Sequence, residues 1–195
     1  MTVRDMRAAV VLFLVLAVVT GLMYPLAMTG VGQVLFPRQA NGSLMRVHGR
    51  VVGSALIGQY FRGRGMFWSR PSATSPTPYN AEASSASNIG PDNPALRKHV
   101  AARVAAVRKL NPQEKGPVPI DLVTSSASGL DPDISVAAAR YQVARVARVT
   151  KIPKARLDAL IKRYTTPRSL GFLGEPVVNV VKLNVALWKL RGGHF

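Results

Sequence analysis

The chain has 195 residues and no cysteine, which excludes disulfides, thiolate metal sites and a cysteine nucleophile. This length is enough for a membrane span and a further domain with its own hydrophobic core. Lysine and arginine number 26 against 9 aspartates and glutamates, so the formal net charge is +17 at pH 7. Such an excess of positive charge raises the question of anionic partners, such as nucleic acid or a membrane surface.

The N-terminal apolar segment is the strongest signal in the sequence, since residues 8–37 contain no charged side chain. Residues 8–28 supply the roughly 20 apolar helical residues that cross a bilayer core of about 30 Å. A cleaved signal peptide also begins with basic residues and an apolar run, but this run is long and no small-x-small cleavage site follows it. A buried core helix is disfavoured, because an ordinary helix of a globular domain carries a polar stripe. We predict a short cytoplasmic N-terminus (1–7), a transmembrane helix (8–28) and one extramembrane domain (29–195).

The first part of this domain is expected to form short strands. Residues 39–59 are rich in glycine and β-branched side chains, with turn signals at Asn41-Gly42 and His48-Gly49. Residues 60–68 mix aromatic side chains with glycines. Residues 69–93 are dense in Ser, Pro, Thr and Ala, a composition typical of a flexible linker.

The second part is predicted to be mainly helical. A helix begins after the N-cap Asn93 and ends before Pro112. A strand is predicted at residues 118–124, and a further segment, 177–191, begins as a strand and finishes as a helix. Between them, Ser135 caps a helix that places Val136, Ala139, Val143 and Val146 on one face, and Pro153 opens another. The predicted fold class is α+β, with few strands and three or four helices behind the transmembrane helix.

The positive charge is spread along the predicted helices rather than gathered in a block. This pattern is typical of solvated helix faces, and no aromatic RNA-binding motif accompanies it. Nucleic acid is therefore not an expected partner. The residues concerned are Arg97, Lys98, Arg103, Arg108, Lys109, Arg140, Arg145 and Arg148.

Catalytic motifs are missing from the sequence. It contains no nucleophile elbow, phosphate-binding loop, zincin motif or dinucleotide fingerprint. His48, His99 and His194 lie far apart, so no shared metal site is expected. Asp131 and Asp133 lack the downstream Glu of a calcium loop, and a helix-entry turn is the favoured interpretation. The chain is thus predicted to be a subunit or binding module without catalytic residues, metal ligands or a cofactor of its own.

Several segments, taken in order and spacing, carry a specific resemblance. The chain closely resembles, over nearly its whole length, the C subunits of the bacterial Kdp high-affinity potassium-transporting ATPases. The matching stretches are Tyr24-Pro25, 39–44 (QANGSL), 53–59 (GSALIGQ), 70–74 (RPSAT), 78–80 (PYN), 123–135 (VTSSASGLDPDIS), 145–147 (RVA), 174–181 (GEPVVNVV) and Leu183-Asn184.

The resemblance implies a single-span, non-catalytic subunit of a four-part pump in the bacterial inner membrane. Its partners would be a channel-like potassium-translocating subunit, a P-type ATPase subunit, a small single-span subunit and the lipid bilayer. ATP and Mg²⁺ would act at the ATPase subunit, and potassium would be the transported ion. The family role is assembly and activity of the pump, as a catalytic chaperone that raises the ATP affinity of the ATPase subunit.

The resemblance also changes the interpretation of two loops. Residues 69–93 become an ordered signature loop, and Gly129 a position of close backbone approach. Gln142 is a nucleotide candidate because a polar residue interrupts its helix, with a solvated side chain as the favoured alternative. The candidate partner contacts are Asn41, Arg70, Pro71, Ser72, Tyr79, Asn80, Ser128, Gly129 and Asp131.

Topology separates the possible mechanisms. Arginines stand on both sides of the span, and long domains translocate largely regardless of charge. We favour a cytoplasmic N-terminus and a periplasmic domain, which makes any effect on ATP affinity allosteric. Two other classes stay open: a membrane-tethered basic module that binds an anionic envelope polymer or nucleic acid, and an enzyme that acts alone.

Overall fold

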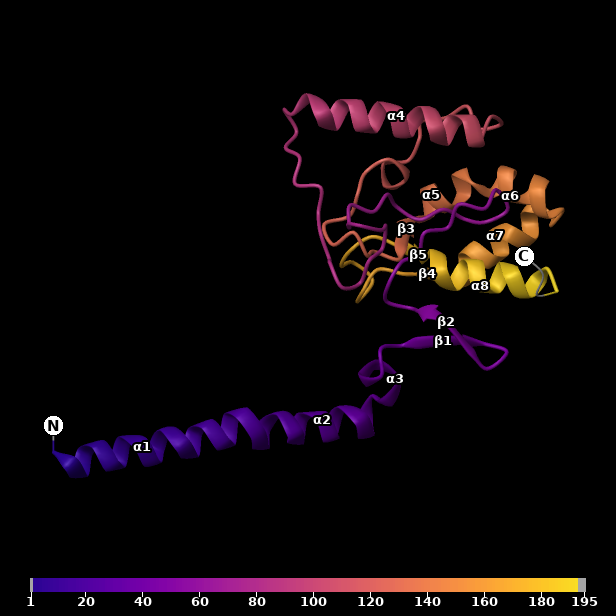
Figure 1. Cartoon of the computed structure of the whole chain (residues 1–195). Helices are drawn as coiled ribbons and strands as arrows, with labels where there is room; N and C mark the ends of the chain where they lie inside the picture. Colours follow the sequence, from indigo (N-terminus) through magenta and orange to yellow (C-terminus); the bar gives the residue numbers. More distant parts are fainter. Residues whose placement is uncertain (1, 193–195) are drawn as a thin grey trace. The chain divides into compact units, whose positions relative to one another are not determined.

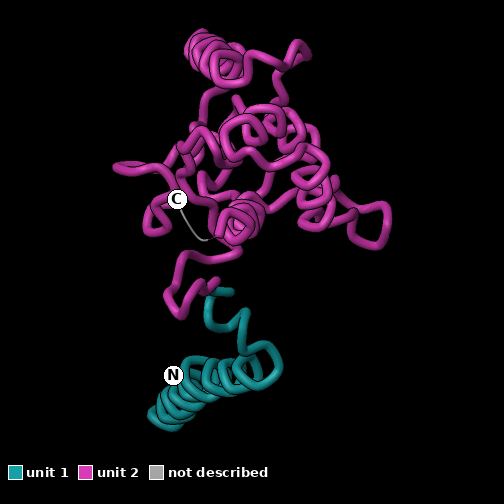
Figure 2. Tube along the Cα trace, turned by 90° about the vertical axis from the view of Figure 1, so that its right-hand side faces the viewer, with its two compact units in different colours: residues 1–44 teal, residues 45–195 magenta. Residues whose placement is uncertain are grey.

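The computed structural model describes residues 2–192. The chain divides into two compact units, one of residues 1–44 and one of residues 45–195 (Figure 2). The second unit holds the mixed helix and strand domain that the sequence predicted.

The first unit is dominated by one apolar helix, Val3–Leu35, long and apolar enough to cross a membrane. It comprises α1 (Val3–Val18), a π-helical turn (Val19–Met23) and α2 (Tyr24–Leu35), and it is followed by α3 (Pro37–Ala40). Thr2 and Asp5 form a capping box at its start. The helix runs past both ends of the predicted 8–28 segment, and it fits a single-pass membrane protein.

Pro25 lies inside this helix without ending it. A proline in a helix lacks the N–H donor and crowds the carbonyl four residues earlier, here that of Gly21. The π-helical turn Val19–Met23 lies at this position, which is a common way for a helix to accommodate such a conflict.

The second unit contains two small sheets and a set of helices (Figure 1). Helix α4 lies on one side of α5 and α6, and α8 lies on the other. The elements are β1 (Leu44–Val47), β2 (Arg50–Ser54), α4 (Pro94–Leu110), a 3₁₀ turn (Ile120–Leu122), β3 (Asp133–Ser135), α5 (Val136–Tyr141), α6 (Val143–Thr150), α7 (Lys154–Arg163), β4 (Thr165–Thr166), β5 (Val177–Asn179) and α8 (Val180–Leu190).

The capping predictions are confirmed. Asn93 accepts from the backbone N–H of Ala95 at the start of α4, and Ser135 accepts from that of Ala138 at the start of α5. Pro153 stands at the N-cap of α7. The segment from Val177 begins as a strand and continues as α8, as predicted.

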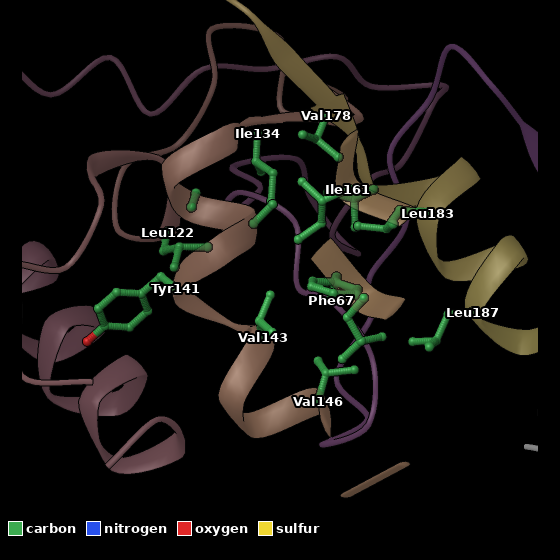
Figure 3. Close-up of a cluster of buried hydrophobic side chains, with 14 of the residues drawn as sticks. Phe67, Leu122, Ile134, Tyr141, Val143, Val146, Ile161, Val178, Leu183 and Leu187 are labelled. Carbon is green, nitrogen blue, oxygen red and sulfur yellow. The ribbon is translucent and has the colours of Figure 1, made fainter. Parts of the chain in front are cut away.

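The central sheet has the antiparallel order β3-β5-β4, which places β5 between two partners. Ile134 of β3 lies opposite Val178 of β5, and Thr165 of β4 also lies opposite Val178. Val178 is fully buried, and Ile134 is almost so. These side chains join the main hydrophobic core, in which Phe67 lies among side chains of α6, α7 and α8 (Figure 3).

Three predictions about local structure are wrong. Residues 118–124 form a loop with a 3₁₀ turn rather than a strand, because Pro117 and Pro119 have no N–H to donate to a sheet. The predicted helix after Ser135 is two helices, α5 and α6, separated at Gln142. The flexible-linker interpretation fails for residues 69–80, since this loop is held by many hydrogen bonds, described below.

Candidate interaction site

Residues 64–68 have no regular secondary structure, yet they carry Phe67 into the core of the domain. Phe67 is completely buried. The side-chain amide of Asn184 on α8 accepts from the Phe67 N–H at 2.9 Å and donates to the Phe67 carbonyl at 2.8 Å. Buried backbone groups need such partners, because an unpaired one costs about 1–3 kcal/mol.

The side-chain amide of Gln142 forms the same pair of hydrogen bonds with the backbone of Trp68. Its Oε1 accepts from the Trp68 N–H at 2.7 Å, and its Nε2 donates to the Trp68 carbonyl at 3.1 Å. Only 1% of Gln142 is exposed, so the favoured alternative of a solvated side chain is wrong. Both ends of the amide that suggested a nucleotide contact are occupied by groups of the protein itself.

Arg145 completes this buried arrangement, which we call the amide lock (Gln142, Arg145 and Asn184). Its guanidinium donates to the carbonyls of Arg64 and Met66, and to the side chains of Asn111 and Gln142. The partners are neutral oxygens, and burial lowers the pKa of Arg145 to about 10. Arg145 is 2% exposed, so its assignment to a solvated helix face is wrong.

The signature loop is organised by two hydroxyl groups. Ser72 Oγ donates to the Gly129 carbonyl at 2.7 Å and accepts from the Tyr79 N–H at 2.9 Å. Thr74 Oγ1 donates to the Thr77 carbonyl at 2.7 Å and accepts from the Asn80 N–H at 3.0 Å. These bonds hold residues 72–80 of the signature loop together and join them to Gly129.

Arg70 makes the charged contacts of this site. Its Nη1 lies 3.3 Å from an Asp131 carboxylate oxygen and 4.0 Å from one of Asp121. Asp131 also accepts from the Asp133 N–H at 2.9 Å, and Asp121 accepts from the Ser135 N–H at 2.9 Å. The bond between Asp131 and Asp133 fits the helix-entry turn predicted for these two residues. The carboxylates that lie near Arg70 are those of Asp121 and Asp131.

Tyr79 closes the loop against Arg70. Its hydroxyl donates to the Arg70 carbonyl at 2.5 Å. Burial raises the pKa of Tyr79 to about 12. Gly58 makes room for the ring, because a Cβ there would lie 2.3 Å from a Tyr79 ring carbon.

Gly129 is the position where the resemblance implied a close backbone approach, and within the chain itself such an approach is found there. A Cβ there would lie 2.7 Å from the Ser85 carbonyl oxygen and 2.7 Å from Thr74 Cγ2. The residue also has φ +69°, which favours glycine. Ser85 donates its N–H to the Ser128 carbonyl at 2.9 Å on the same side.

Most of the residues singled out by the resemblance thus gather in one place. Asn41 does not belong to this group: it lies in the first unit, where its amide donates to Gln33 and to the Pro37 carbonyl. Gln142 belongs to the amide lock. The gathered residues are Arg70, Pro71, Ser72, Tyr79, Asn80, Ser128, Gly129 and Asp131.

Sequence reasoning missed three basic or aromatic residues next to this cluster. Arg62, Trp68 and Arg103 line the same pocket as Arg70 and Tyr79. The alternation of aromatic residues with arginine in 60–68 was the available signal. His194 lies outside the described residues, and residues 2–192 contain no group of three or more His, Cys, Asp or Glu placed to hold a metal ion.

The Gly129→Ala variant should destabilise the full chain by about 2–4 kcal/mol, because left-handed backbone strain adds to overpacking. Chemical denaturation followed by circular dichroism would measure this loss. Gly90→Ala is the matched control, since nothing lies within 4 Å of its Cβ, and it should change stability by less than about 0.5 kcal/mol. Equal stability of the two variants would contradict the close approach.

Tyr79 should contribute a pH-dependent term to stability. Its pKa is raised above the usual value near 10, so its contribution is fully present below pH 10 and is lost as pH rises through about 12. Chemical denaturation measured from about pH 9 to about pH 12 should show that the free energy of unfolding falls less steeply with pH for Tyr79→Phe than for the wild type. Tyr60→Phe, an exposed site, should keep the wild-type slope. Parallel profiles for wild type and Tyr79→Phe would contradict the assignment.

Comparison with known protein sequences identifies the family of the chain. The sequence profile of the family described as "K+-transporting ATPase, c chain" matches residues 6–189. A "Potassium-transporting ATPase KdpC subunit" of Methylibium petroleiphilum is 57% identical over 182 residues, which cover 93% of this chain and 95% of the relative. Its namesake in Methylococcus capsulatus is 54% identical over 189 residues, or 97% of this chain and 100% of the relative. The chain belongs to the KdpC family, the C chains of K⁺-transporting ATPases.

Proposed function

We propose that this chain is a non-catalytic accessory subunit of an ATP-driven potassium uptake complex, needed for its assembly and activity. The observation that carries the proposal is the family match over residues 6–189, together with relatives that are named as potassium-transporting ATPase subunits. The polar side chains Ser72 and Thr74 of the signature loop hold the loop itself, which supports a structural rather than a catalytic role for them.

The partners in this proposal are a channel-like potassium-translocating subunit, a P-type ATPase subunit and a small single-span subunit. ATP and Mg²⁺ act at the ATPase subunit, and potassium is the transported ion. This chain contributes no cofactor. It acts as a catalytic chaperone that raises the ATP affinity of the ATPase subunit.

The proposed location is the bacterial inner membrane, with the N-terminus in the cytoplasm and the main domain in the periplasm. ATP is then on the opposite side from the domain, so the effect on ATP affinity passes through the apolar helix Val3–Leu35. This helix carries Gly21, Gly30 and Gly32, and such small residues let partner helices approach closely.

The KM for ATP of potassium-stimulated hydrolysis tests the chaperone role. Complexes lacking this chain should show a KM about tenfold higher than complete complexes, within the usual range of allosteric coupling. Adding back the purified full chain should restore the low KM. An unchanged KM in complexes that still assemble would contradict the chaperone role, and failure to assemble would support the assembly role alone.

Site-directed cysteine labelling tests the orientation of the chain in the membrane. Because the sequence contains no cysteine, only the introduced one can react. Ser75 is exposed in the second unit, and Val3 is exposed at the start of the apolar helix. In intact cells a membrane-impermeant maleimide should label Ser75→Cys but not Val3→Cys, and permeabilisation should expose Val3→Cys. The reverse pattern would place the domain in the cytoplasm and make direct ATP contact the leading mechanism.

A further inference from the structure

A small pocket beside the signature loop combines arginine and aromatic side chains. Its volume is about 90 Å³. Residues from separate parts of the chain meet there: the segment 59–62, the segment 68–71, Tyr79 later in the signature loop, helix α4, and Leu122 of the 3₁₀ turn. The residues that carry the argument are Tyr60, Arg62, Trp68, Arg70, Tyr79 and Arg103.

The positive charge of this pocket is only partly balanced. The two carboxylates nearby, Asp121 and Asp131, both lie against Arg70. Even so, Arg70 Nε is buried without a hydrogen-bond partner. In residues 2–192, no ion pair involves Arg62 or Arg103.

Arg62 and Arg103 are held in place by uncharged groups. The Arg62 guanidinium lies 4.3 Å from the centre of the Tyr60 ring and 4.8 Å from that of Trp68. Arg103 donates to the Val123 carbonyl at 3.0 Å. Burial lowers the pKa of Arg103, and the nearby charge of Arg62 lowers it further. An anion between these groups would relieve that repulsion.

The size of the pocket limits what the anion can be. Sites for drug-sized ligands and nucleotides have volumes of about 300–1,000 Å³. A pocket of about 90 Å³ admits a group of carboxylate size but not a nucleotide. Arginine is suited to this task, because its planar fork binds a carboxylate through two parallel hydrogen bonds.

We propose that this pocket receives the carboxylate of an acidic side chain presented by another subunit of the complex. The proposal rests on the accessory-subunit role and deepens it by naming the docking surface and the chemistry of its partner. The half-buried rings of Trp68 and Tyr79 reduce the access of water to the half-buried guanidinium groups of Arg70 and Arg103, which strengthens the attraction. A protein side chain is favoured over a free anion because the chain belongs to a family of subunits of a larger ATPase.

The pocket holds one of the two tryptophans of the chain, which provides a direct probe. The full chain is prepared with 5-fluorotryptophan and joined to unlabelled partner subunits. Trp68 should then show a change in ¹⁹F chemical shift on assembly. Arg62→Gln and Arg103→Gln should weaken the association of the chain by about tenfold or more and reduce this shift change.

Two controls keep the result specific. Arg97→Gln and Arg108→Gln remove the same charge from exposed positions on α4 outside the pocket, and they should associate as the wild type does. Arg62 is exposed, so Arg62→Gln should retain the wild-type unfolding midpoint, which is measured for each variant. Arg62→Lys keeps the charge and should lose less affinity than Arg62→Gln.

Two results would overturn the proposal. One is an unchanged Trp68 signal on assembly together with unaltered association of both pocket variants. The other is a saturable change of the Trp68 ¹⁹F signal when inorganic phosphate or acetate is added to the assembled complex. Such binding would assign the pocket to a free anion. The KM for ATP, measured on the same complexes, reports separately on the chaperone role.

Discussion

The domain depends on how an irregular segment is held inside its core. Residues 64–68 carry Phe67 into the centre of the hydrophobic cluster without the hydrogen bonds of a helix or sheet. Asn184 and Gln142 each form a pair of hydrogen bonds with the backbone of one residue, in the manner of a neighbouring strand. Arg145 donates hydrogen bonds to the carbonyls of Arg64 and Met66.

This amide lock also fixes the start of the signature loop. Trp68, held by Gln142, is followed two residues later by Arg70, whose position relative to Asp121 and Asp131 follows from the same backbone. The loop then closes through the hydroxyls of Ser72 and Thr74. The amide lock therefore stabilises both the hydrophobic core of the domain and the signature loop at its surface.

The sequence allowed the regular elements to be predicted, because their signals are local. The apolar helix, the caps at Asn93 and Ser135 and the strand-to-helix change after Val177 all depend on neighbouring residues. The hairpin turn at His48-Gly49 is likewise local, with both residues at positive φ. In residues 118–124, however, β-branched side chains suggested a strand where the prolines prevent one.

The site could be predicted only in part. The resemblance identified most residues of the signature cluster, because their order along the chain is distinctive. It left the roles of Gln142 and Arg145 open, since these depend on partners far away in sequence: Gln142 bonds to a residue 74 positions earlier, and Asn184 to one 117 positions earlier. Local pattern describes Arg145 as one more basic helix residue, and only the fold buries it.

Hydrogen exchange of the Phe67 and Trp68 backbone amides in the full chain tests the amide lock most directly. Both N–H groups lie in a segment without regular structure, where exchange is ordinarily fast. We predict that they exchange as slowly as the amides of the core helices α6 and α8, only through global unfolding. Exchange as fast as that of the exposed residues Ser87 and Asn88 would contradict this prediction, because the lock would then not hold the segment in solution.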